Sequence, residues 1–205
     1  MINGHGDDLY KYNVEVKSNF SSNIYSHADL SGLKKHLSGR MDVIGSYPEP
    51  EPYSLEKALA EECGIEANEI MVTNGATEAI YLAARLTNEK LAGSGINLIS
   101  MPTFSEYADA CRMAGGKTMS SESGYIGKAT HWMCNPNNPT GTVISGKELL
   151  NIAAESKNDI FVIDQSYEHY TTLKLISDRE GADAGNIILI HSMTKQFCIP
   201  GLRLG

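Results

Sequence analysis

Short apolar runs alternate with helix-like segments over residues 54–205, and this alternation constrains the fold more than any other feature. The runs IFVID (160–164) and IILI (187–190) are typical of strands buried on both faces of a sheet. Weaker runs predict strands at 69–73, 96–101 and 130–134, and helical periodicity predicts helices over 76–86, 105–114 and 145–156. The alternation predicts an α/β fold: a three-layer, mostly parallel sheet with helices on both faces.

Residues 1–53 have a different character, with Tyr, Asn, Ser and Pro throughout and no regular apolar pattern. Prolines at 48, 50 and 52 deny a helix there and favour extended chain. Ser54 can then cap a first helix that Gly64 ends. We therefore expect an N-terminal arm over 1–53 and an α/β domain over 54–205.

Composition excludes several classes of protein. The 205 residues include 17 basic and 25 acidic side chains, a net charge of −8, and no run of Lys or Arg, so nucleic acid is not an expected partner. Four cysteines without a CxxC pair predict neither a zinc site nor a disulfide framework, and no metal is expected. The first residues lack a basic and apolar leader, and no apolar run approaches the ~20 residues of a membrane span. With free thiols, these features favour the cytoplasm.

In a parallel sheet, ligands collect at the carboxyl ends of the strands, so the residues after each run are the candidate site. The first such segment is 73–78 (TNGATE). Gly75 lets the backbone approach a ligand, and the N–H groups of Ala76 and Thr77 at a helix start favour an anion. On its own, this segment is more often a simple helix cap.

Two further strand ends carry polar groups. Residues 134–141 (CNPNNPTG) contain two Asn-Pro steps and a glycine, which predict a rigid turn that fixes the amide of Asn138. Asp164 ends a buried strand, where an ionised carboxylate requires a cation or hydrogen-bond donors. Tyr167 can bring a phenol to the same place. A solvated Asp at a strand end is the equally common alternative.

The fourth segment, 192–203, contains Lys195 after a buried strand, between the hydroxyl side chains of Ser192 and Thr194, and Arg203 eight residues later. Desolvation and a nearby Arg lower the pKa of an amine, as a Schiff-base lysine requires. Most single lysines lie on the surface. The four segments together nevertheless predict one site that combines amine, acid, phenol, amide and anion cradle.

The ordered motifs NPNNPTG, D-x-x-Y and S-x-[ST]-K followed by Arg resemble the large domain of fold-type-I pyridoxal-phosphate enzymes. From about Tyr47 to Gly205 the chain is similar to class I/II aminotransferases, in the group that holds histidinol-phosphate aminotransferase and threonine-phosphate decarboxylase. The segments GHGDD (4–8) and NFSSNI (19–24) resemble the cobalamin-pathway decarboxylase more than the histidine-pathway enzyme.

The resemblance implies roles for individual residues. Lys195 would hold pyridoxal 5′-phosphate as a Schiff base and then move the Cα proton of the substrate. Asp164 would pair with the pyridinium nitrogen and keep it protonated, so that the ring serves as an electron sink. Tyr167 and Asn138 would hydrogen-bond the phenolic oxygen of the ring.

The resemblance also implies a phosphate site and further contacts. The phosphate would be held by Gly75, Ala76, Thr77, Ser192, Thr194 and Arg203. Tyr107 would stack on the cofactor ring, although a core tyrosine on a helix face is an alternative for that residue. Tyr47 would reach the phosphate in the partner subunit's site of a homodimer. Asn23 would contact the substrate.

The family continues past the phosphate-binding Arg into a smaller C-terminal domain that supplies an Arg for the substrate carboxylate. This sequence stops at Gly205, so we expect an incomplete large domain without the small domain. The leading interpretation is a pyridoxal-phosphate-dependent enzyme of the aminotransferase family that acts on an amino acid, or on a phosphorylated amino acid or amine, through a Schiff base at Lys195.

Three alternatives stay open. The first is threonine-phosphate decarboxylase by the same cofactor chemistry, and the second is a truncated cofactor-binding domain without turnover. A nucleotide-binding α/β domain is less favoured, because the sequence has neither GxGxxG nor GxxxxGK[ST].

Overall fold

The computed structural model describes residues 9–25, 27–91 and 95–205. Within these residues the strands form one five-stranded sheet, in which every neighbouring pair is parallel, in the order β2–β1–β3–β4–β5. The strands are β1 (Ile96–Ile99), β2 (Lys117–Ser120), β3 (Ala129–Cys134), β4 (Ile160–Asp164) and β5 (Ile187–Ile190). The α/β class and the parallel sheet are therefore confirmed.

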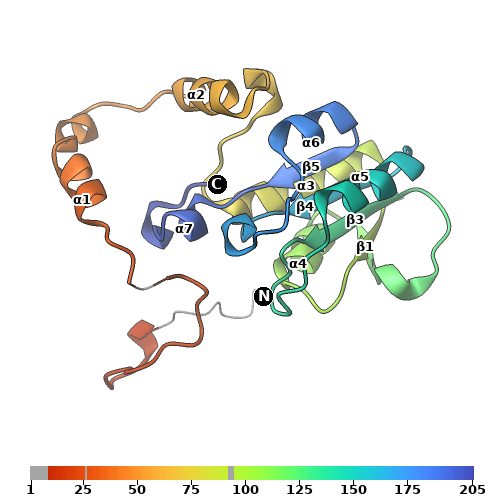
Figure 1. Cartoon of the computed structure of the whole chain (residues 1–205), viewed down its shortest axis with the longest axis horizontal. Coiled ribbons are helices and arrows are strands. Elements are labelled where there is room, and N and C mark those ends of the chain that lie inside the picture. Colours follow the sequence, from red (N-terminus) through yellow and green to blue (C-terminus); the bar gives the residue numbers. More distant parts are fainter. Residues whose placement is uncertain (1–8, 26, 92–94) are drawn as a thin grey trace.

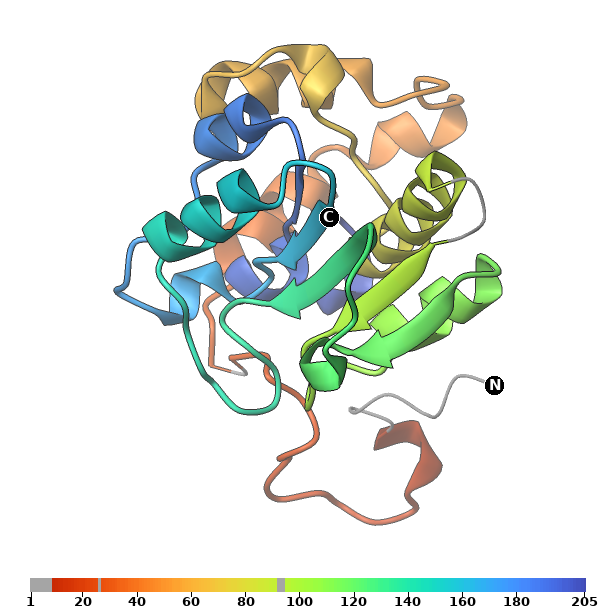
Figure 2. The same ribbon diagram turned by 90° about the vertical axis from the view of Figure 1, so that its right-hand side faces the viewer.

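Helices cover both faces of the sheet (Figures 1 and 2). The helices are α1 (Ser31–Ser38), α2 (Tyr53–Cys63), α3 (Ala76–Lys90), α4 (Glu106–Met113), α5 (Gly146–Glu155), α6 (Asp178–Ala184) and α7 (Met193–Gln196). Side chains of α3 and α4 pack on one face, and those of α5 pack on the other. The three-layer arrangement predicted from the alternation is thus present.

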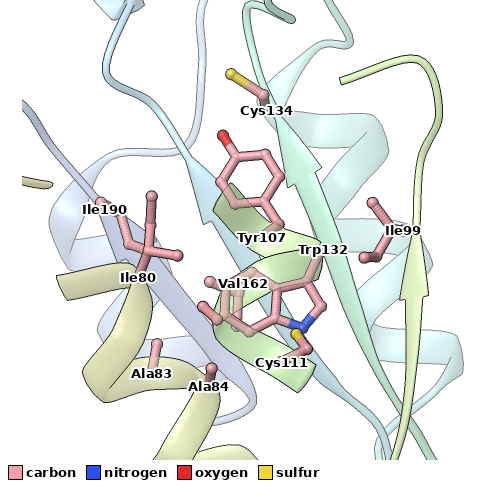
Figure 3. Packing of buried hydrophobic residues seen from close by; sticks show 11 residues of the cluster. Ile80, Ala83, Ala84, Ile99, Tyr107, Cys111, Trp132, Cys134, Val162 and Ile190 are labelled. Atoms are coloured by element: carbon pink, nitrogen blue, oxygen red, sulfur yellow. The ribbon is translucent and has the colours of Figure 1, made fainter. Parts of the chain in front are cut away.

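Two hydrophobic cores lie on the two faces of the sheet, and β4 contributes to both. Val162 packs with α3 and α4, in the core shown in Figure 3, whereas Phe161 and Ile163 pack with α5. All three side chains are at most 1% exposed. Side chains on a strand point alternately to its two faces, so one apolar strand without polar interruptions can fill both cores.

Residues 9–25 and 27–50 run outside these layers as an arm, coloured red to orange in Figure 1. Most of its side chains are exposed, Phe20 at 96% and Tyr47 at 102%. The arm is not wholly irregular, because it contains α1 and a 3-10 turn at Met41–Gly45 that the sequence did not predict. The GHGDD segment at 4–8 lies outside the described residues.

The prediction of a strand at 69–73 is wrong. Ala67–Glu69 forms a 3-10 turn, and Ile70 to Thr73 belong to no strand. Instead, Thr73 exchanges both backbone hydrogen bonds with Gly205, at 2.8 and 3.2 Å, the pattern of an antiparallel pair. Met71 is 68% exposed, so an apolar run alone did not bury this segment.

Helix boundaries differ slightly from the prediction. Helix α2 begins at Tyr53, with Pro52 at the capping position, and the Ser54 hydroxyl donates instead to Glu49 at 3.0 Å. Gly64 ends the helix at φ 70°, as predicted. Ser145 caps α5 by accepting a hydrogen bond from the Glu148 N–H. Among the described residues, no helix is both long and apolar enough to cross a membrane.

Candidate functional site at the carboxyl ends of the strands

The sheet brings three of the four candidate segments to one edge. In the strand register, Cys134 of β3 lies opposite Asp164 of β4, and Asp164 lies opposite Ile190 of β5. The turn after β3, the Asp164–Tyr167 segment and the Lys195 loop therefore leave the sheet side by side. This is the edge at which ligands bind in parallel sheets.

Asp164 is a buried carboxylate with two hydrogen-bond donors. It is 4% exposed; Oδ2 accepts a bond from the Tyr107 hydroxyl at 2.7 Å, and Oδ1 accepts one from the Ser166 N–H at 2.8 Å. A buried carboxylate is tolerated when donors of this kind replace water. The alternative of a solvated strand-end Asp is excluded.

Tyr107 reaches the site through its hydroxyl. The residue is 1% exposed, and its ring stacks on Trp132 with centroids 5.9 Å apart (Figure 3). Burial, followed by the charge of Asp164, raises the pKa of Tyr107 well above its ordinary value, so the hydroxyl stays a donor. The Tyr107 ring, which we expected to stack on the cofactor, therefore packs inside the hydrophobic core.

Phe104 is the aromatic residue that the sequence analysis missed. Its half-buried ring meets Tyr107 edge-on, at a centroid distance of 5.7 Å. It follows β1 at the same carboxyl edge of the sheet, in Pro102-Thr103-Phe104. The rule that ligands collect after strand ends could have found it, had it been applied to β1 as it was to β4.

Lys195 lies in α7 with its Nζ 5.6 Å from the centroid of the Tyr167 ring, within the range of a cation–π contact. Burial lowers the pKa of Lys195; the negative charge of Asp164 opposes this shift, and the positive charge of Arg203 adds to it. A lowered pKa increases the fraction of neutral amine, which is the nucleophilic form. The structure thus places the Lys195 amine near both the Tyr167 phenol and the Asp164 carboxylate.

The arm contributes Asn23 to the candidate site around Lys195 and Tyr167. The Asn23 side chain donates to the Tyr167 hydroxyl at 3.2 Å, and the backbone carbonyl oxygen of Asn23 accepts from the Tyr170 hydroxyl at 3.3 Å. Burial raises the pKa of Tyr167, and the Asn23 hydrogen bond acts in the opposite direction. Tyr47, by contrast, is fully exposed.

The start of α3 and the Lys195 loop form a polar cradle. Gly75 caps α3 at φ +83°, without a side-chain cap on the N–H groups that follow, those of Ala76 and Thr77. A Cβ at Gly75 would lie 2.6 Å from Nη2 of Arg203, so only glycine lets the guanidinium lie against this turn. The hydroxyls of Ser192 and Thr194, both buried, are 2.7 Å apart.

The turn after β3 is held together by its own asparagines. Asn135 exchanges two 2.8 Å hydrogen bonds with the backbone of Ile144. Asn137 donates to the Pro102 carbonyl at 2.9 Å and accepts from the Thr103 hydroxyl at 2.9 Å. This is the rigid turn predicted from the sequence, and half-buried Asn138 lies within it.

Comparison with known proteins agrees with this geometry. The family described as Aminotransferase class I and II matches residues 15–205. The chain is 30% identical to the adenosylcobalamin biosynthesis bifunctional protein CobDQ of Leptospira interrogans, over 98% of this chain and 25% of that protein. It is 27% identical to a histidinol-phosphate aminotransferase of Ruminiclostridium cellulolyticum, over 79% of this chain and 49% of that protein.

A solved structure is also similar. The L-threonine-O-3-phosphate decarboxylase of Porphyromonas gingivalis superimposes with a TM-score of 0.81 at 34% identity, over 91% of this chain and 58% of that one. The chain thus spans about half the length of such relatives, and the further length of the relatives has no counterpart in its 205 residues.

Pyridoxal 5′-phosphate is the cofactor that this family indicates, and the residues at the edge of the sheet fit it. The cradle at Gly75 and Arg203, where a Cβ would collide, suits a phosphate, and the buried hydroxyls of Ser192 and Thr194 add donors. Lys195 supplies an amine of lowered pKa, and Asp164 a buried carboxylate. The chain belongs to the class I and II aminotransferases, a family of pyridoxal-phosphate-dependent enzymes.

Proposed function

We propose that this chain is the cofactor-binding part of an enzyme that transforms an amino acid through Lys195. The observation that carries the proposal is the setting of the Lys195 amine, half-buried against Tyr167, with a pKa lowered by burial. When bound, pyridoxal phosphate supplies an electron sink for the substrate's Cα. The side chains around it bind and orient the cofactor and move the proton.

We assign to these positions the roles that the resemblance to the family implies. Asp164, held in place by Tyr107 and Ser166, would accept the N–H of the pyridinium ring. Tyr167 and Asn138 would hydrogen-bond the phenolic oxygen, and Phe104 would offer the ring face that Tyr107 does not. Ser192, Thr194, Arg203 and the start of α3 at Gly75, Ala76 and Thr77 would hold the phosphate.

Covalent capture of the cofactor tests this proposal. Borohydride reduction of the chain mixed with pyridoxal phosphate should fix the cofactor to the peptide that contains Lys195. Lys195→Arg should abolish the label, whereas Lys174→Arg should keep it, because the Lys174 side chain is 82% exposed in an ion pair with Glu180. Label on any other lysine would refute the assignment.

Decarboxylation of a phosphorylated small amino acid is the second candidate function. The decarboxylase structure is 34% identical to this chain, whereas the histidinol-phosphate aminotransferases reported by sequence or structure are less similar. We propose threonine phosphate as the substrate of the whole protein, with Asn23 as a substrate contact. Carbon dioxide released from threonine phosphate without a keto acid would support this. Amino transfer from histidinol phosphate to 2-oxoglutarate, without such release, would decide for the aminotransferase.

We further propose a homodimer in the cytoplasm, assembled through the arm (1–53) and the large domain (54–205). Exposed apolar side chains on the arm, Phe20, Ile44 and Tyr47, support this, because exposed apolar surface favours association. Tyr47 then reaches the phosphate in the partner subunit's site. A monomer that binds the cofactor, measured by light scattering, would contradict this assembly. Binding without turnover would indicate the alternative of a non-catalytic domain.

A further inference from the structure

His191 lies between two carboxylates that come from different parts of the chain. It directly follows β5, and its side chain is 25% exposed. Its Nδ1 lies 3.0 Å from Oε1 of Glu168, and its Nε2 lies 2.9 Å from Oδ1 of Asp178. Glu168 follows Tyr167 in the chain, Asp178 is the first residue of α6, and Ser192 follows His191.

This geometry favours a protonated ring. Nδ1 of His191 hydrogen-bonds Glu168, whereas Nε2 lies 2.9 Å from Asp178 as an ion pair, outside hydrogen-bond geometry. A neutral imidazole has one N–H and one lone pair, and would turn that lone pair toward one of the two carboxylates, whereas the imidazolium faces both with a positive charge. Burial alone lowers the pKa of His191, but hydrogen bonds and charge from Asp178 and Glu168 raise it to about 10. The close contact with His191 also lowers the pKa of Asp178, against the effect of burial.

The surroundings of the cluster extend to α2. The Cys63 thiol hydrogen-bonds Asp178, and burial together with this bond raises the pKa of Cys63 to about 12. His169 Nε2 lies 3.3 Å from Oε1 of Glu168. In the described ranges, no group of three or more His, Cys, Asp or Glu side chains could hold a metal ion.

The cluster lies just past the point where backbone hydrogen bonds between β4 and β5 end. The sheet register holds β4 and β5 together as far as Asp164 opposite Ile190, and the Gln165 N–H still donates to the Ile190 carbonyl at 2.7 Å. Beyond that point one segment leads to Tyr167 and the other to Lys195. The Glu168–His191 pair joins the two segments just past the end of the sheet.

We propose that protonated His191 is a positioning residue, which sets the placement of Lys195 relative to Tyr167 by binding Glu168 and Asp178. It acts through the two segments rather than on the substrate. The inference rests on the proposed function, since it takes Lys195 and Tyr167 as the site. Its consequence can be measured without cofactor: loosening the segments should hydrate Lys195 and raise the pKa of its amine.

The test is the pH profile of Lys195 acetylation in the cofactor-free chain, by competitive labelling with acetic anhydride and mass spectrometry. His191→Gln removes the cation, and Glu168→Ala removes one of the two carboxylates that pair with it. His131→Gln is the matched control, because the His131 side chain is also 25% exposed and pairs with a carboxylate, Asp159, at 3.0 Å. That pair lies at the amino end of the sheet, where Asp159 precedes β4.

We expect His191→Gln to raise the labelling midpoint of Lys195 by about half a pH unit or more, toward the ordinary lysine value of ~10.4. Glu168→Ala should raise it too, and His131→Gln should leave it unchanged. Loss of a charge alone would act with opposite sign in the two variants, because one removes a cation and the other an anion. An upward shift in both therefore indicates positioning.

Two results would overturn the proposal. One is an unchanged midpoint in His191→Gln while its unfolding temperature falls as in His131→Gln, which would mean a purely structural role. The other is a lowered midpoint in Glu168→Ala, which also decides the question if His191→Gln does not fold. Borohydride labelling of Lys195 is a separate readout, so failure of this inference is distinguishable from failure of the proposed function.

Discussion

Tyr107 and Asp164 form a buried 2.7 Å hydrogen bond that joins α4 to the end of β4, and neither residue is more than 4% exposed. The bond links the hydrophobic core to the charged centre of the candidate site. It gives Asp164 a fixed donor, so the orientation of the carboxylate is set by side chains of the protein itself.

Tyr107→Phe should destabilise the chain by about 1.5–3 kcal/mol, the usual contribution of a hydrogen bond to a charged group. Tyr81→Phe is the matched control, since the Tyr81 hydroxyl donates to the buried Glu106 carboxylate at the same 2.7 Å. Urea unfolding should show a loss in both variants. Only Tyr107→Phe should weaken pyridoxal-phosphate binding in an absorbance titration; equal affinities in the two variants would contradict the role of the bond.

Gly75→Ala should lower cofactor affinity as well as stability. The substitution places a Cβ 2.6 Å from the Arg203 guanidinium and strains a backbone at φ +83°. Gly185→Ala is the control, because φ is +73° there but no heavy atom lies within 4 Å of the added Cβ. Strain alone should destabilise the control by about 1–2 kcal/mol. If the two variants bind the cofactor equally well, the cradle is not at Gly75.

Asp164→Asn should keep covalent labelling at Lys195 but reduce turnover of the whole protein by about 100-fold or more. A neutral amide cannot hold a ring nitrogen protonated, so the electron sink is lost. Asp159→Asn, which changes a carboxylate at the opposite end of the sheet, should retain turnover. Near-wild-type turnover in Asp164→Asn would show that this carboxylate is not the partner of the ring.

The stability of the chain should depend on pH through His191. Its pKa is about 10 in the folded chain against about 6.5 when unfolded. The stabilisation is therefore fully present below pH 6.5 and is lost as the pH rises through 10. Over this window the wild type should lose about 1.4 kcal/mol per pH unit relative to His191→Gln. Urea unfolding at pH 7, 8 and 9 measures the difference, and a constant difference would contradict the doubly paired imidazolium.

Strands with buried apolar runs could be predicted from the sequence, but the outermost strand, β2, could not. Strand β2, KTMS, is mostly exposed and carries no apolar run, so nothing in its residues distinguishes it from a loop. Conversely, residues 69–73 have a strand-like composition but lack neighbouring strands. Pairing partners come from distant parts of the chain, and local pattern does not contain that information.

The candidate site, too, could be predicted only in part from the sequence. The rule that ligands bind at the carboxyl ends of parallel strands located Asp164, Tyr167 and Lys195. Parallel pairing brings these ends together whatever conformation the side chains adopt. The rule could not show that Tyr107 points its hydroxyl at Asp164, since that direction depends on how α4 packs on Trp132. Nor could it find the pairing of His191 with Asp178, which arises only when α6 folds back against β5.

The two cores that meet on β4 imply an uneven rate of hydrogen exchange across the site. Backbone amides of Phe161, Val162 and Ile163 lie between both cores and should exchange only when the whole domain opens. Lys195 instead lies on a four-residue helix next to exposed Gln196 and Phe197, where small openings suffice. The carboxylate should thus stand on a slowly exchanging strand and the amine on a faster-exchanging short helix. Cofactor binding should accordingly slow exchange at Lys195 much more than at Asp164.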